Sequence, residues 1–177
     1  KMIKNQKTIK NEITLSGIGL HTGKEVTLTF KPAPINHGYA FVRVDLQGAP
    51  TIQPKAEYVV DTRRGTNLEK NGVSIHTSEH VLAAAVGLGV TNLLIELNAA
   101  EPPIMDGSSK YFVEALEKAV ITEQEAPMEP YVVKEVISYK EEATGSEIMI
   151  MPSDTYEVTT MVDFGTQILG TQNASIS

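Results

Sequence analysis

The fold is decided in residues 76–97, which read HTSEHVLAAAVGLGVTNLLIEL. Apolar residues recur at helical spacing through the first half of this stretch, which predicts a helix over about Ser78–Leu88. Thr77 is the candidate N-cap, and two glycines near the end of the apolar run are stop signals. The stretch closes on Asn92–Leu97, an apolar strand candidate. It therefore predicts a helix followed by a strand.

Strand patterns dominate the sequence before this stretch. Glu25–Phe30 and Tyr39–Asp45 both alternate between apolar and polar residues and are bounded by turn-forming residues. A second helix is predicted over about Ser109–Val120, because apolar residues line one face there after the Asp106–Gly107 turn. Many strands with two helices indicate an α+β fold with a mostly antiparallel sheet.

The second half of the sequence repeats part of the first. Glu123–Pro130 contains two prolines and three glutamates and is interpreted as a linker. Val26–Asp45 is a strand, a proline turn and a strand ending in Asp, and Glu147–Asp163 has the same pattern. We expect residues 1–126 to form a first domain. Residues 127–177 are then a linker and the beginning of a second, incomplete repeat domain.

Composition excludes several classes of function. The 177 residues hold 15 Lys and Arg against 22 Asp and Glu, a net charge of −7, which argues against nucleic-acid binding. Without cysteine there is no disulfide or thiolate metal site, so any transition metal must bind His and Asp or Glu. The longest apolar run, Val81–Val90, is well short of the roughly 20 residues of a membrane span. No signal-peptide pattern begins the sequence, and a cytoplasmic protein is expected.

His76–His80 is the segment in which catalytic chemistry is easiest to place. Zinc hydrolysis needs imidazole or carboxylate ligands, an open position for water and a carboxylate base. Glu79 in the first helical turn is kept ionised by the helix dipole, as a base must be, and His80 is a candidate ligand. The alternative is that Glu79 is a helix-start acid and His80 a core or capping histidine.

Two other functions are compatible with these residues. The segment also matches His-x-x-Glu-His, the inverted zinc-peptidase pattern, which needs both His76 and His80 inside one helix. Thr77 as N-cap leaves His76 outside that helix and disfavours a peptidase. The third interpretation is a non-catalytic binding or assembly module without a metal site.

Three further segments carry turn chemistry or charge. They are Ser16–Gly23, Asp61–Thr66 and Glu101–Ser108, which read SGIGLHTG, DTRRGT and EPPIMDGS. The first is a glycine-rich hairpin turn with an exposed His21 as its simplest interpretation. The second offers arginine donors to an anionic substrate or simply carries solvated charge. The third sets the geometry between a strand and a helix through its two prolines and Asp-Gly turn.

Taken in order with residues 78–89, these segments resemble the UDP-3-O-acyl-N-acetylglucosamine deacetylases, the zinc amidases that commit a sugar nucleotide to lipid A synthesis in Gram-negative bacteria. The resemblance is close over residues 5–125 and looser over 131–177. It implies two similar domains, each a two-layer β-α-α-β sandwich, with zinc where their helices face one another. The implied reaction releases acetate from UDP-3-O-(3-hydroxyacyl)-N-acetylglucosamine, the UDP-linked substrate that the resemblance implies as the binding partner.

The resemblance also assigns roles to individual residues. Glu79 is implied as the general base and His80 as the zinc ligand of the first domain. His21 is implied near the site entrance, and Thr62, Arg63 and Arg64 border the substrate. The remaining Zn²⁺ ligands, a His and an Asp spaced His-x-x-x-Asp, and an acidic His are expected beyond residue 177, since no His follows His80. The chain alone is expected to be inactive and to self-associate through its incomplete second domain.

Overall fold

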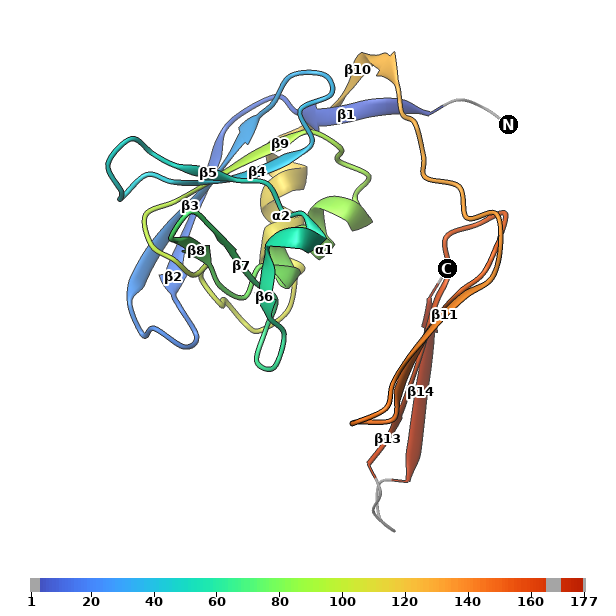
Figure 1. Cartoon of the computed structure of the whole chain (residues 1–177). Coiled ribbons are helices and arrows are strands. Elements are labelled where there is room, and N and C mark those ends of the chain that lie inside the picture. The colour runs from blue at the N-terminus through green and yellow to red at the C-terminus, as the bar shows by residue number, and fades with distance from the viewer. Residues whose placement is uncertain (1–3, 165–169, 177) are drawn as a thin grey trace. The chain divides into compact units, whose positions relative to one another are not determined.

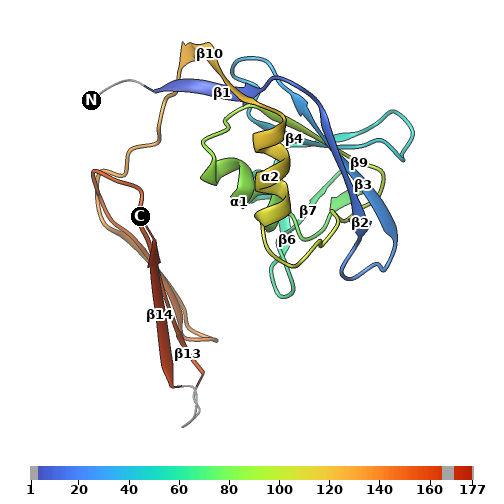
Figure 2. The same ribbon diagram turned by 180° about the vertical axis from the view of Figure 1, so that it is seen from behind.

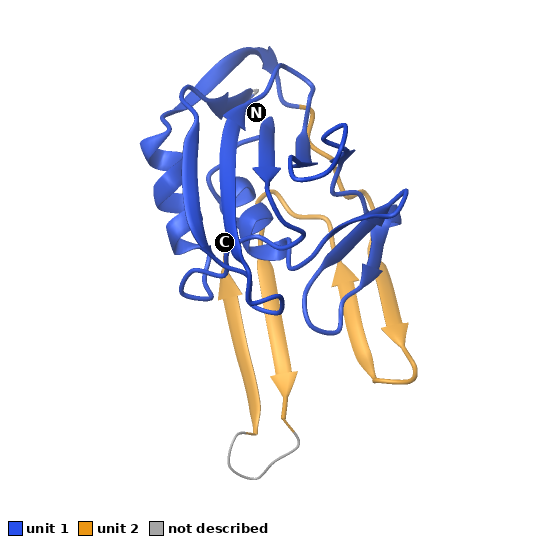
Figure 3. Ribbon diagram, turned by 90° about the vertical axis from the view of Figure 1, so that its left-hand side faces the viewer, with its two compact units in different colours: residues 1–128 blue, residues 129–177 orange. Residues whose placement is uncertain are grey.

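The structure is a computed structural model that describes residues 4–164 and 170–176. The chain divides into two compact units at Met128/Glu129, which Figure 3 colours separately. The first unit contains both helices, and most of its strand pairs are antiparallel, so the expected α+β class is confirmed. No helix among the described residues is long and apolar enough to cross a lipid bilayer.

A five-stranded sheet forms the centre of the first unit (Figure 1). Its strands, in spatial order, are β2 (Ile13–Ile18), β3 (Glu25–Pro32), β9 (Leu93–Leu97), β4 (Tyr39–Arg43) and β5 (Thr51–Ile52). All neighbours are antiparallel except β4 and β9, which are parallel. The alternation expected from the sequence is visible in β3, where every second side chain is buried.

Both helices pack on one face of this sheet (Figure 2). They are α1 (Glu79–Gly87) and α2 (Lys110–Lys118), each within its predicted range. Phe30 of β3 and Phe112 of α2 meet edge to face with ring centroids 6.4 Å apart. The predicted N-cap Thr77 is wrong, because Ser78 occupies the cap position while Thr77 adopts a left-handed backbone conformation.

A small three-stranded sheet precedes α1 along the chain. It contains β6 (Val59–Asp61), β7 (Asn67–Lys70) and β8 (Val73–Ile75) after the short 3₁₀ helix η1 (Ala56–Tyr58). Its antiparallel register pairs Leu68 with Ile75, and both are buried in the same core as the helices. This sheet brings the loop between β6 and β7 to the start of α1.

The expected linker at residues 123–130 is wrong for its first five residues. They belong to β10 (Ile121–Pro127), which pairs antiparallel with β1 (Asn5–Ile9). Ile9 pairs with Ile121, so the end of the first unit is tied to its beginning. Prolines and glutamates are compatible with this strand because only one of its edges is paired in the sheet.

The second unit consists of two antiparallel hairpins. The first pairs β11 (Ile137–Glu141) with β12 (Ser146–Ile150), and the other pairs β13 (Val158–Asp163) with β14 (Thr171–Ile176). Strands β12 and β13 lie where the repeat predicts them. Nearly every described side chain of these hairpins is exposed. An isolated two-stranded hairpin is marginally stable in water.

Replacing Phe112 by Ala tests the contact between α2 and the sheet. The variant removes a fully buried ring and should lower the free energy of unfolding by about 3–5 kcal/mol. Urea denaturation measures this change, with Tyr111→Ala as the control on the exposed side of the same helix. The control should stay within about 0.5 kcal/mol of the parent. Equal losses in the two variants would contradict the packing described above.

Candidate active site

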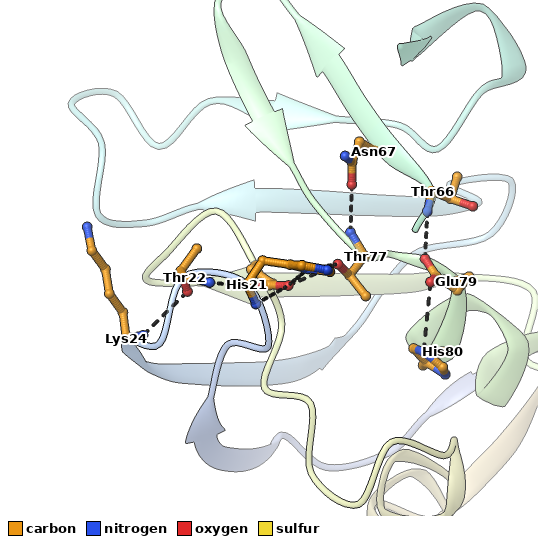
Figure 4. Close-up of polar contacts among 9 residues, drawn as sticks. His21, Thr22, Lys24, Thr66, Asn67, Thr77, Glu79 and His80 are labelled. Atoms are coloured by element: carbon orange, nitrogen blue, oxygen red, sulfur yellow. Dashed lines mark hydrogen bonds and ion pairs between the residues drawn. The ribbon is translucent and has the colours of Figure 1, made fainter. Parts of the chain in front are cut away.

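The segment ahead of α1 has an irregular backbone that is held on several sides. Thr77 has a φ of +51°, an unfavourable left-handed conformation for a β-branched residue that costs about 1–3 kcal/mol. Its N–H donates to Asn67 Oδ1 at 3.0 Å (Figure 4), and its hydroxyl donates to Glu101 Oε1 at 2.9 Å. Ser78 follows, fully buried, and its hydroxyl donates to the carbonyl of Thr66. These bonds determine where the first turn of α1 begins.

Glu79 opens α1 with one carboxylate oxygen engaged. Oε2 accepts the N–H of Thr66 at 2.8 Å (Figure 4), and the side chain retains 38% exposure. Gly65, in the same loop, has a φ of +146°. A Cβ there would lie 3.2 Å from Glu79 Oε1 and 3.3 Å from Thr77 Cα. Glycine at 65 therefore lets the loop between β6 and β7 approach this carboxylate without backbone strain or crowding.

His80 lies beside Glu79 in the same helical turn. Its Nε2 is 3.8 Å from Glu79 Oε1, and its side chain is 32% exposed. The hydroxyl of Ser109, the N-cap of α2, donates to the His80 carbonyl at 2.9 Å. The imidazole and one carboxylate oxygen thus lie close together within reach of solvent, an arrangement suited to a metal ligand and a base for water.

His76 does not share a helix with His80. It precedes α1, and its N–H donates to the carbonyl of Ala100 at 2.7 Å. The prediction that His76 lies outside the helix is confirmed. The inverted peptidase pattern therefore lacks the i, i+4 geometry that its two ligands require.

Glu101, to which the sequence assigned no role in the site, accepts a cluster of buried hydrogen bonds next to the start of α1. The residue is 1% exposed, and its carboxylate accepts the N–H groups of His21 and Thr22 at 3.0 and 3.1 Å and the Thr77 hydroxyl. A further contact of 2.9 Å joins Oε1 to His21 Nδ1. Burial raises the pKa of Glu101, but these hydrogen bonds outweigh burial and hold it below its ordinary value. The only signal in the sequence is an acid placed directly between an apolar strand and two prolines.

The residues expected to border the substrate occupy two loops. His21 lies in the turn between β2 and β3, with its side chain 37% exposed and tied to Glu101. The other three, Thr62, Arg63 and Arg64, lie exposed in the loop between β6 and β7. Thr66 of the same loop donates its N–H to the Glu79 carboxylate. The Arg63 guanidinium pairs with the Asp61 carboxylate and lowers the pKa of Asp61 to about 2. Arg63 is thus already engaged by a neighbouring acid.

The described part of the chain contains no group of three or more His, Asp or Glu that could hold a metal ion. His80 has the donor chemistry and exposure of a single zinc ligand, with Glu79 beside it. These two residues fit part of a zinc site.

A sequence model of the family described as LpxC, UDP-3-O-acyl N-acetylglycosamine deacetylase, matches residues 6–177. The chain is 46% identical over 175 residues to a bifunctional LpxC/FabZ enzyme of Chlorobaculum tepidum and 44% identical over 171 residues to one of Bacteroides thetaiotaomicron. These alignments cover 99% and 97% of the chain but 38% and 37% of the relatives. A UDP-3-O-acyl-N-acetylglucosamine deacetylase of Chromohalobacter salexigens is 42% identical over 172 residues, 97% of the chain and 56% of the relative. The chain thus spans between about a third and just over half of these proteins.

Glu101 should make the free energy of unfolding of the first unit depend on pH in the acidic range. Its folded-state pKa is lowered, so its contribution is complete above the ordinary value of about 4.5 and disappears as the pH falls through the folded value. The stabilities of the parent and of Glu101→Gln in urea should therefore differ most near neutral pH, and the difference should shrink as the pH falls below about 4.5. Glu117→Gln, which removes an exposed charge on α2, is the control. A gap that stays constant down to pH 3 would contradict this assignment.

Gly65→Ala should lower the free energy of unfolding by about 1–3 kcal/mol. Alanine is strained at the positive φ of this position, and its Cβ would also crowd the Glu79 carboxylate. Gly72→Ala is the matched control: Gly72 also has a positive φ, +77°, but no atom lies within 4 Å of a Cβ there. The control should lose about 1 kcal/mol, from backbone strain alone. Urea denaturation compares the two, and a larger loss at 72 would argue against the close contact at Glu79.

Proposed function

Since the chain belongs to the UDP-3-O-acyl N-acetylglycosamine deacetylase family, we propose that the protein containing it hydrolyses the acetamide of UDP-3-O-(3-hydroxyacyl)-N-acetylglucosamine and releases acetate, the committed step of lipid A synthesis. The observation that carries the proposal is the pairing of Glu79 and His80 at the first turn of α1, inside the matched region. The loop between β6 and β7, whose Thr66 N–H donates to the Glu79 carboxylate, also carries three of the residues expected to border the substrate.

Glu79 acts as the general base in this proposal. Its Oε2 is occupied by the Thr66 N–H, so Oε1, which faces His80, is the oxygen available to accept a proton from the attacking water. The fixed hydrogen bond orients the carboxylate before substrate arrives, and this orientation does not have to be created during the reaction. Partial exposure of both side chains leaves room for water and substrate.

His80 supplies one zinc ligand. When bound, zinc provides a Lewis acid for the acetamide carbonyl and a water whose pKa is lowered to around 7. The His80 imidazole must be neutral to bind, and its main chain is anchored by Ser109. The other two ligands and the acid that protonates the leaving amine are assigned to sequence beyond residue 177, because the chain spans only part of its relatives.

His21, Thr62, Arg63 and Arg64 are proposed to contact the UDP-linked substrate. Three of them lie exposed on the loop between β6 and β7, and His21 lies exposed in the turn between β2 and β3. Exposed guanidinium groups suit a diphosphate, which accepts bidentate hydrogen bonds. Because Arg63 is paired with Asp61, Arg64 is the stronger of the two candidates.

Residues 129–177 are proposed to begin a second domain similar to the first two-layer β-α-α-β sandwich. The order of elements supports this: the β11–β12 hairpin and the β13–β14 pair correspond in sequence order to β2–β3 and β4–β5. Large apolar side chains are exposed throughout this unit, among them Tyr131, Tyr156 and Met161. Without the remainder of the domain, such surfaces favour self-association of the isolated chain.

The test is turnover of the full-length, zinc-loaded protein. Glu79→Gln keeps the side-chain shape and its bond to Thr66 but removes the base, so turnover should fall by about 10²–10⁴-fold. Glu69→Gln, an exposed acid on β7, should retain parental turnover. His80→Ala should weaken zinc binding, as measured by calorimetry. A folded parent protein that releases no acetate would overturn the proposed function and leave a binding module as the alternative.

A further inference from the structure

The conformation of Thr77 decides how α1 presents its first two residues. Thr77 stands two positions before Glu79, in a left-handed conformation that a β-branched residue does not adopt unless it is held there. Asn67 Oδ1 accepts a hydrogen bond from its N–H (Figure 4), and Glu101 accepts one from its hydroxyl. A change in the backbone at 77 would redirect the start of α1 and move the Glu79 and His80 side chains with it.

Glu101 connects Thr77 to a second loop. Its carboxylate also accepts the N–H groups of His21 and Thr22, which are 80 and 79 positions away in the sequence. Gly19 allows the turn to close on it, because a Cβ at that position would lie 2.8 Å from Glu101 Oε2. One buried carboxylate therefore joins the turn between β2 and β3 to the residue that sets the start of α1.

The surroundings of Glu101 fit a role that is indirect. It is 1% exposed, so it does not reach substrate, and both carboxylate oxygens already accept hydrogen bonds. The hydrogen bonds keep its pKa below the ordinary value, so the carboxylate remains ionised and a strong acceptor at neutral pH. A buried charge is tolerated only with such a complete set of partners.

We propose that Glu101 is a positioning residue for the deacetylation proposed above: acting through Thr77, it places the Glu79 carboxylate and the His80 imidazole in their working geometry. The inference rests on the proposed function. It extends that function to a residue outside the exposed site, and it makes the turn carrying His21 part of the same support.

Two nearly isosteric variants of the full-length protein test the proposal. Glu101→Gln keeps the side-chain shape but removes the charge and one acceptor oxygen, and Thr77→Val removes only the hydroxyl that bonds to Glu101. Asn92→Ala is the matched control, because Asn92 is also buried and hydrogen-bonded, to the Gly38 N–H, Gln6 and Gln124, in a different polar cluster. All three variants should lower the melting temperature.

Only the first two variants should change the chemistry. We expect kcat to fall about 10–100-fold in Glu101→Gln and Thr77→Val, with zinc bound more weakly, as is usual for groups that orient a metal ligand or base. KM should change little in Thr77→Val, which leaves the Glu101 bonds to the His21 turn in place, and should rise in Glu101→Gln, which weakens the hold on that turn. The double variant should lose about as much as Glu101→Gln alone, because both changes break the same link. Asn92→Ala should keep the parental kcat.

Hydrogen exchange measured by mass spectrometry gives a readout that needs no activity. Backbone amides of residues 76–82 should exchange faster in Glu101→Gln and Thr77→Val than in Asn92→Ala. Parental kcat in Glu101→Gln, an equal loss of kcat in Asn92→Ala, or unchanged exchange at 76–82 would each overturn the proposal. If the parent protein itself releases no acetate, the proposed function fails, and the exchange comparison still decides whether Glu101 sets the start of α1.

Discussion

Glu101 is a buried, ionised carboxylate, and such a group is stable only when several hydrogen-bond donors surround it. The first unit depends on meeting this condition. Its oxygens accept hydrogen bonds from the turn between β2 and β3 and from Thr77, and a missing donor would leave the charge without compensation. The turn and the segment before α1 must therefore form together. Among the described residues, no buried side-chain nitrogen or oxygen lacks a hydrogen-bond partner, so this cluster is complete.

The sheet topology explains why α1 lies where these groups can meet. Strands β4 and β9 are parallel neighbours, and a parallel pair needs a long crossover connection. The chain between them supplies the small β6–β7–β8 sheet and then α1, which packs on the large sheet. The loop between β6 and β7 and the first turn of α1 thereby lie side by side, and the Thr66 N–H reaches the Glu79 carboxylate.

Local patterns predicted most elements but not their partners. Apolar periodicity located β3, β9, α1 and α2, because burial of one face is written into the spacing of apolar residues. Residues 123–127 were expected to belong to the linker 123–130. They form a strand only through pairing with β1, more than a hundred positions away, which no local pattern reveals. Thr77 was expected to cap α1 from local capping preference. That preference is overridden by the bonds of Thr77 to Asn67 and Glu101, which come from distant parts of the fold.

The sequence by itself determined the α+β class, the positions of the helices and the family, because composition, periodicity and ordered motifs are properties of the chain as written. It also placed Glu79 and His80 next to each other, and their catalytic roles stay predictions. Only the tertiary structure decided that Gly65 leaves space for Glu79, that Arg63 is paired with Asp61 and that Glu101 supports Thr77. The bond between Glu101 and the His21 N–H joins residues 80 positions apart. No local preference encodes such a contact, because it exists only when packing of the whole unit brings the two segments together.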